Sequence, residues 1–134
     1  MKGIKLLLVE DETVTAMIEK KQLEDYGYII NHALSGEEAV ELLCVNNLSF
    51  HCILMDIDLG KGIDGTEAAR QILLYKEVPI VFLSNHTEPE IVKKTEKISS
   101  YGYIVKDSSI TVLDASIKMA LKLFKSKEFY HNTL

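Results

Sequence analysis

Acidic residues follow two short apolar runs of this sequence. Glu10 and Asp11 stand after the run LLLV, and Asp56 and Asp58 end the stretch ILMDID. Carboxylates that are brought close together repel one another, unless one of them is protonated or a cation lies between them. Mg²⁺ suits such a group, because this ion keeps several waters and shares its octahedral shell with a substrate phosphate. The acidic residues therefore predict a site for Mg²⁺, with Mn²⁺ as an alternative ion.

Two further polar residues have the chemistry to bind a phosphoryl group at such a site. Ser84 follows the apolar run PIVFL, and Lys106 follows GYIV. With the metal in place a phosphoryl group can approach the acidic residues, and the hydroxyl and the ammonium can bind its oxygens. Asp56 can then be the nucleophile and form an aspartyl phosphate, which is a known type of covalent catalysis.

These side chains meet only if the apolar runs lie in one sheet. Five β-like runs alternate with five longer amphipathic stretches. We expect strands at residues 4–9, 28–33, 52–56, 79–84 and 102–106, and helices at about 13–25, 36–45, 65–75, 88–98 and 109–125. Three of the strands are almost continuously apolar, which is typical of a parallel sheet covered on both faces. The alternation predicts a doubly wound α/β domain, in which ligands bind beyond the carboxyl ends of the strands.

Length and charge restrict the classes of function. The 134 residues suffice for one domain, expected at residues 1–125, with residues 126–134 as a tail or the start of a linker helix. The net charge of −5 argues against direct binding of nucleic acid, which depends on clustered Lys and Arg. No apolar run approaches the ~20 residues that a membrane-spanning helix requires, and no signal peptide is recognisable. We therefore expect a cytoplasmic protein without membrane contact.

The sequence resembles response-regulator receiver domains, the phosphoacceptor modules of two-component signalling. The resemblance covers residues 4–124 and rests on four motifs in the right order, LLLVEDE, ILMDIDL, VFLSNH and GYIVKD. It implies a flavodoxin-like (βα)5 fold with strand order 2-1-3-4-5. It also implies that the donor is the phosphohistidine of a sensor histidine kinase or a histidine phosphotransfer domain, and that the domain is a switch rather than a turnover enzyme.

The motifs of the resemblance also imply the roles of the acidic site residues. Asp56 corresponds to the phosphoacceptor, and Lys106 to the ammonium beside it. Glu10 and Asp11 correspond to the acidic pair, with Asp11 as the more direct metal ligand. Asp58 corresponds to a position that gives its backbone carbonyl to the metal.

A second implication of the resemblance is a conformational switch. Ser84 corresponds to the hydroxyl that the phosphoryl group attracts, and Tyr103 to the aromatic side chain that turns inward with it. The face formed by the fourth helix, the fifth strand and the fifth helix, with Ile91, Lys94 and Tyr101, is then expected to bind a partner. A homodimer would use the same face.

Three departures from the usual receiver pattern affect these expectations. The loop after Asp56 is one residue longer than usual and lacks a proline. Asn85 replaces a small residue, so we expect an altered lifetime of the phosphoryl group, of unknown sign. Asp107 stands where proline is usual, and a cis bond before a non-proline residue costs roughly 3 kcal/mol, so this bond is either strained or trans.

Other functions fit the same residues less well. The Asp-x-Asp of haloacid-dehalogenase-type phosphatases matches Asp56 and Asp58, but that family has the motif on its first strand. A flavodoxin needs a phosphate loop rich in hydroxyls and glycines after the first strand, and this sequence has EDETVT there. A receiver-like interaction module that accepts no phosphate is the main alternative, although none of Asp11, Asp56, Ser84 or Lys106 is lost.

Overall fold

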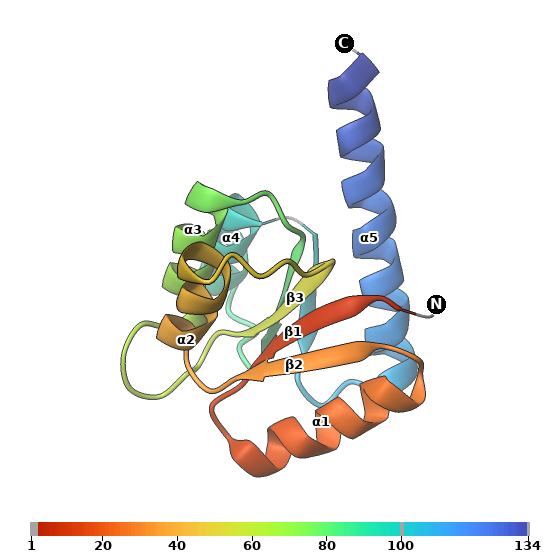
Figure 1. The fold of residues 1–134 in the computed structure, drawn as a ribbon. Coiled ribbons are helices and arrows are strands. Elements are labelled where there is room, and N and C mark those ends of the chain that lie inside the picture. Colours follow the sequence, from red (N-terminus) through yellow and green to blue (C-terminus); the bar gives the residue numbers. More distant parts are fainter. Residues whose placement is uncertain (1–2, 100, 134) are drawn as a thin grey trace.

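The computed structural model describes residues 3–99 and 101–133, in which strands and helices alternate along the chain (Figure 1). The strands are β1 (Lys5–Val9), β2 (Ile29–Ala33), β3 (Cys52–Asp56), β4 (Ile80–Ser84) and β5 (Tyr103–Val105). The helices are α1 (Thr13–Asp25), α2 (Gly36–Val40), α3 (Gly65–Tyr75), α4 (Pro89–Ile98) and α5 (Ile110–Thr133), and α2 continues into a π-helical turn, η1 (Glu41–Val45). None of the described helices is long and apolar enough to cross a membrane.

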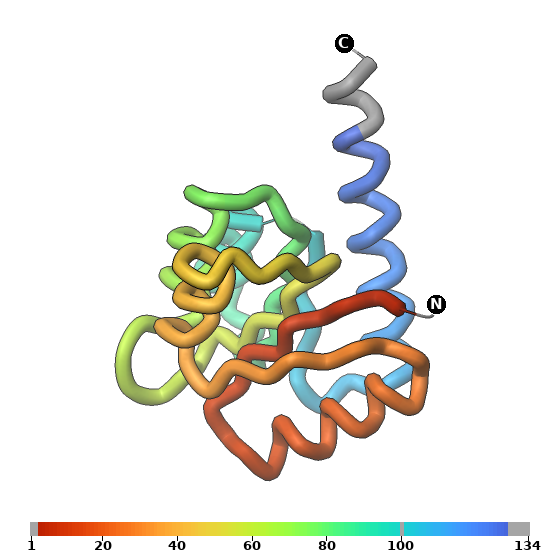
Figure 2. Tube along the Cα trace, in the orientation of Figure 1, coloured from red at the N-terminus to blue at the C-terminus, as the bar shows by residue number. Residues whose placement is uncertain are grey.

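The five strands form one parallel sheet in the order β2-β1-β3-β4-β5, which confirms the predicted fold. Helices α1 and α5 cover one face of the sheet, and α2, α3 and α4 cover the other (Figure 1). The tube in Figure 2 shows that α1 returns alongside β2 and that α5 extends well beyond the sheet. The carboxyl ends of all five strands therefore lie along one edge.

The apolar runs are continuous because both faces of each central strand are buried. Successive side chains of a strand point to opposite faces, and in β3 Leu54 packs under α1 and α5 while Ile53 and Met55 pack under α2 and α3. In β4, Val81 packs on the face covered by α1 and α5, and Phe82 packs on the opposite face. All five of these side chains have no exposed surface.

Two helices differ from the lengths that we expected. The helix expected at residues 36–45 is α-helical only as far as Val40 and then widens into a π-helical turn. The last helix was expected at about 109–125, with residues 126–134 as a tail or the start of a linker helix; it continues to Thr133, since no Gly or Pro occurs between residues 110 and 133 to stop it. The described residues contain no cis peptide bond, so the bond between Lys106 and Asp107 is trans.

A buried hydrogen bond ties the start of β2 to α5. The Tyr28 hydroxyl donates to Asp114 Oδ1 at 2.5 Å, and Lys118 Nζ lies 2.8 Å from Asp114 Oδ2. Burial by itself would raise the pKa of Asp114, but hydrogen bonds from Lys118 and Tyr28 hold this pKa below its usual value. The carboxylate form of Asp114 therefore stabilises the folded state.

We expect Tyr28→Phe to lower the free energy of unfolding by about 1–2 kcal/mol at neutral pH, because a buried acceptor loses its donor. A lowered pKa in the folded state contributes stability that is present above the unfolded value and is lost as the pH falls through the folded value. The deficit of the variant should therefore shrink as the pH falls below about 3.8, the ordinary pKa of the group. Urea unfolding at neutral and acidic pH measures this, with Tyr26→Phe as the exposed control. An equal deficit at both pH values would contradict the assignment.

Candidate metal and phosphoacceptor site

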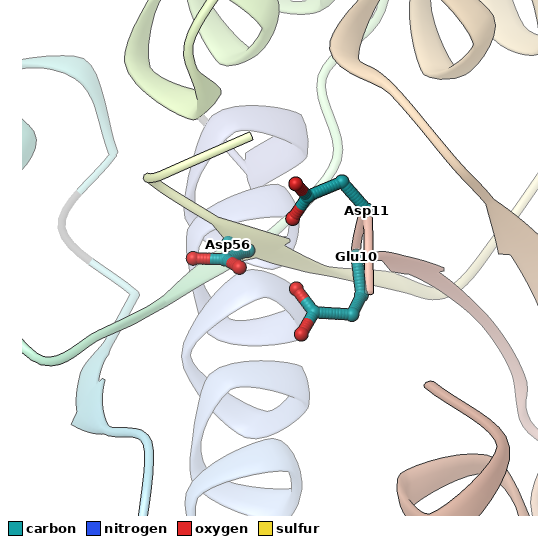
Figure 3. Close-up of side chains that lie close together, drawn as sticks. All are labelled: Glu10, Asp11 and Asp56. Atoms are coloured by element: carbon teal, nitrogen blue, oxygen red, sulfur yellow. The ribbon is translucent and has the colours of Figure 1, made fainter. Parts of the chain in front are cut away.

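Three carboxylates meet at the carboxyl edge of the sheet (Figure 3). Glu10 and Asp11 follow β1, Asp56 ends β3, and the two strands are paired neighbours. One oxygen of each carboxylate lies within 4.8 Å of the others. Glu10 and Asp56 are only 1% and 2% exposed. Parallel pairing thus brings together residues that are more than forty positions apart in the sequence.

Lys106 reaches this group from the end of β5, across β4. Its Nζ atom lies 2.8 Å from Asp56 Oδ2 and 3.0 Å from Glu10 Oε1, and the side chain is 19% exposed. Burial opposes the charge of Lys106, but the hydrogen bonds to Asp56 and Glu10 outweigh it and raise the pKa of the ammonium. One ammonium thus pairs with two of the three carboxylates.

The negative charge of the site exceeds what Lys106 can neutralise. Burial, together with the neighbouring Asp56, raises the pKa of Glu10 to about 8. The contribution of Asp56 to this raised pKa shows that the carboxylates repel one another. A cation bound among them removes this repulsion, which protonation of Glu10 would otherwise relieve, so cation binding is favoured here. Glu10, Asp11 and Asp56 are oxygen donors of the kind that Mg²⁺ takes, so they fit a divalent ion.

The loop between β3 and α3 forms the wall of the site. The Asp58 backbone N–H donates to Asp56 Oδ1 at 3.1 Å, and Gly65 N–H donates to the Ile57 carbonyl at 2.9 Å. A Cβ at Gly65 would overlap the Asp56 carbonyl oxygen, and a Cβ at Gly60 would lie 3.0 Å from Asp11 Oδ2. Glycine at these two positions lets the chain pass close to both aspartates.

The Asp58 side chain pairs with a histidine of the next loop. It is 65% exposed and its Oδ2 lies 2.9 Å from His86 Nε2, while His86 Nδ1 lies 3.3 Å from Glu88 Oε2. The hydrogen bond with Asp58, the main cause, raises the pKa of His86. No sequence pattern indicates this bridge between two loops, since a single loop histidine is more often solvated.

Ser84 and Tyr103 lie at the same edge, and among the described residues their side chains hydrogen-bond to His86 rather than to Asp56. Ser84 is fully buried, and its Oγ accepts a hydrogen bond from the His86 N–H at 3.0 Å. The Tyr103 hydroxyl donates to the His86 carbonyl at 2.7 Å. The backbone of His86 therefore connects the two residues that were expected to switch.

The residues expected to bind a partner differ in their surroundings. Lys94 is exposed, Ile91 is partly buried against the core, and the Tyr101 ring packs edge-on against Phe124 at a centroid distance of 5.8 Å. Tyr101 thus contributes to packing between the sheet edge and α5. Asn85 is exposed and lines a cavity of about 360 Å³ beside Lys106 and α1.

Comparison with known proteins gives one family. Residues 6–118 match the family model of the response regulator receiver domain. The chain is 30% identical over 122 residues to the transcriptional regulatory protein PdtaR of Mycobacterium tuberculosis, covering 90% of this chain and 58% of PdtaR. It is 31% identical over 134 residues to the transcriptional regulatory protein YvrH of Bacillus subtilis, covering 98% and 55%. The chain thus spans about half the length of these relatives.

Solved structures give the same result. The N-terminal domain of a response regulator/sensory box/GGDEF three-domain protein from Carboxydothermus hydrogenoformans is 41% identical, with a TM-score of 0.84 over 92% of this chain and 98% of that one. The chemotaxis protein CheY4 of Vibrio cholerae is 24% identical and shares the fold, with a TM-score of 0.79 over 87% and 98%. From the family model, the relatives and the shared fold together, we conclude that this chain belongs to the response regulator receiver domain family of two-component systems.

Proposed function

We propose that Asp56 accepts a phosphoryl group from the phosphohistidine of a sensor histidine kinase or a histidine phosphotransfer domain. The observation that carries this proposal is the pairing of a buried aspartate with Lys106 at 2.8 Å, beside two further carboxylates. The ammonium orients Asp56 and offers its charge to the incoming oxygens. The domain itself then acts as a switch.

The transfer exchanges one bond of phosphorus for another. An oxygen of Asp56 attacks the phosphorus and forms a P–O bond, while the P–N bond of the phosphohistidine breaks and its electron pair leaves with the imidazole, which takes a proton from water. Lys106 then bonds the transferred oxygens rather than the free carboxylate. Asp11, Asp56, Glu10 and the carbonyl of Asp58 would hold Mg²⁺, which when bound neutralises charge on the phosphoryl oxygens.

The switch would pass through the backbone of His86. When the Ser84 hydroxyl turns toward a phosphoryl oxygen, its hydrogen bond from the His86 N–H is disturbed, and so is the carbonyl that holds Tyr103. The phosphoryl group can shift this equilibrium only by binding one state more tightly than the other. The face of α4, β5 and α5 would then bind an effector or a second copy of the chain, with Ile91 and Lys94 among its contacts.

The geometry supports the phosphatase alternative less well. An Asp-x-Asp phosphatase needs its second aspartate beside the nucleophile as a general acid, whereas the Asp58 carboxylate is 65% exposed and pairs with His86. Asn85 lines the cavity beside Lys106, and we expect it to alter how long an aspartyl phosphate survives.

The test is the intact mass of the chain after incubation with Mg²⁺ and acetyl phosphate. We expect one phosphoryl adduct per chain, located on Asp56 by peptide fragmentation and prevented by EDTA. Rapid release of phosphate from varied phosphoesters without an adduct would favour the phosphatase. If neither acetyl phosphate nor a phosphohistidine donor gives an adduct, the domain is a binding module without phosphotransfer.

A further inference from the structure

The Gly60-Lys61-Gly62 segment of the loop between β3 and α3 packs between two acidic side chains. Gly60 and Gly62 both have positive φ, at +67° and +89°, so the segment follows a path that other residues rarely adopt. On one side it lies against Asp11 of the candidate metal site, because a Cβ at Gly60 would lie 3.0 Å from Asp11 Oδ2. Its position therefore matters for the site.

On its other side this segment contacts Glu37, in the first turn of α2. Glu37 Oε2 accepts a hydrogen bond from the Ile63 backbone N–H at 2.9 Å. A Cβ at Gly62 would overlap the same oxygen and lie 2.8 Å from Oε1, so the carboxylate fits directly against the glycine backbone. The segment is thus held between Asp11 and Glu37, which are 26 residues apart.

The Glu37 carboxylate is not needed to cap its own helix. Ser35 is the N-cap of α2 and accepts from the Glu38 N–H, while Glu38 Oε2 accepts from the Leu34 N–H. Ser35 therefore caps the first turn of α2, and Glu38 accepts the N–H of Leu34, the residue before the cap. Among the described residues, Glu37 is the hydrogen-bond partner shown for the backbone of residues 59–63.

We infer that Glu37 is a positioning residue for the metal site, which holds the Gly60–Gly62 segment against Asp11 and fixes the carbonyl of Asp58 on the same loop. The inference rests on the proposed function, since it concerns the ion that Asp11, Asp56 and Glu10 would bind. The hydrogen bond that the Glu37 carboxylate accepts from the Ile63 N–H restrains a glycine-containing segment that would otherwise sample many conformations. Mutation of a residue that holds a metal ligand in place commonly weakens metal binding by about 10- to 100-fold.

The test is a titration of the ¹⁵N-labelled full chain with Mg²⁺, without any phosphodonor, for the native chain, Glu37→Ala and Glu37→Gln. We expect Glu37→Ala to weaken Mg²⁺ binding by about tenfold and to shift the Ile63 amide resonance upfield in the metal-free protein. Glu37→Gln keeps an acceptor oxygen and loses the charge, so it should bind Mg²⁺ close to the native affinity. Glu41→Ala is the matched control, because it removes an exposed acid from the following turn that has no hydrogen bond to the loop.

Each outcome of the titration decides the inference. An equal loss of affinity in Glu37→Ala and Glu37→Gln would show a general effect of charge and overturn the inference, as would an unchanged affinity in Glu37→Ala. Absence of saturable Mg²⁺ binding by the native chain would overturn the metal assignment and this role with it. Tenfold weaker binding by Glu37→Ala alone would support the inference even if acetyl phosphate gave no adduct, in which case only the phosphotransfer proposal would fail.

Discussion

Replacing Asp56 with asparagine is expected to abolish the phosphoryl adduct. The amide of the variant has no anionic oxygen to attack phosphorus, although its shape is nearly that of aspartate. The variant should still fold, because Lys106 keeps its contact with Glu10 at 3.0 Å. Intact mass spectrometry after incubation with Mg²⁺ and acetyl phosphate measures the loss directly.

The matched control for this variant is Asp107→Asn, which makes the same chemical change at an exposed position of the same sheet edge. It should give the adduct at the native level. Transfer of the adduct to Asp11 in Asp56→Asn would show that a neighbouring carboxylate can take over. An undiminished adduct on any other residue would exclude Asp56 as the acceptor.

Replacing Lys106 with alanine is expected to slow phosphorylation by about 100- to 1000-fold, the loss measured when one hydrogen-bond donor to a developing negative charge is removed from an active site. Mg²⁺ binding should persist or tighten, because the metal no longer competes with an ammonium for Asp56 and Glu10. Phosphorylation rates and a Mg²⁺ titration measure the two effects on the same preparation. A parallel loss of metal binding would assign Lys106 a structural role only.

The stability of the same variant separates these roles further. Removing one partner of a buried ion pair leaves charge without compensation, which costs about 3–5 kcal/mol. The metal-free variant should therefore melt well below the native protein, and added Mg²⁺ should recover part of the difference, since a ligand of the folded state stabilises it by mass action. Lys106→Arg tests geometry against charge, because the planar guanidinium retains the charge in a different shape.

The sequence by itself determined the fold and the membership of the site. Strands such as ILMD are apolar at successive positions, and this pattern is stable only where a sheet is covered on both faces. Because parallel strands present their carboxyl ends at one edge, the order of the strand-end residues was enough to place Asp11, Asp56 and Lys106 together. The fold class and the shared edge follow from local periodicity and the direction of the strands, whereas the strand order 2-1-3-4-5 came from the resemblance of the motifs to receiver domains.

Only the tertiary structure decided the contacts between loops. The Glu37 carboxylate accepts a hydrogen bond from the Ile63 N–H, and His86 pairs with Asp58. Both contacts form because of the path that each loop takes between fixed strand ends. That path depends on single backbone angles, such as the positive φ of Gly62, and on the close packing of Gly36 against Ile63. Apolar periodicity carries no information on such angles. In strands and helices buried positions recur at a regular spacing, whereas in loops they do not.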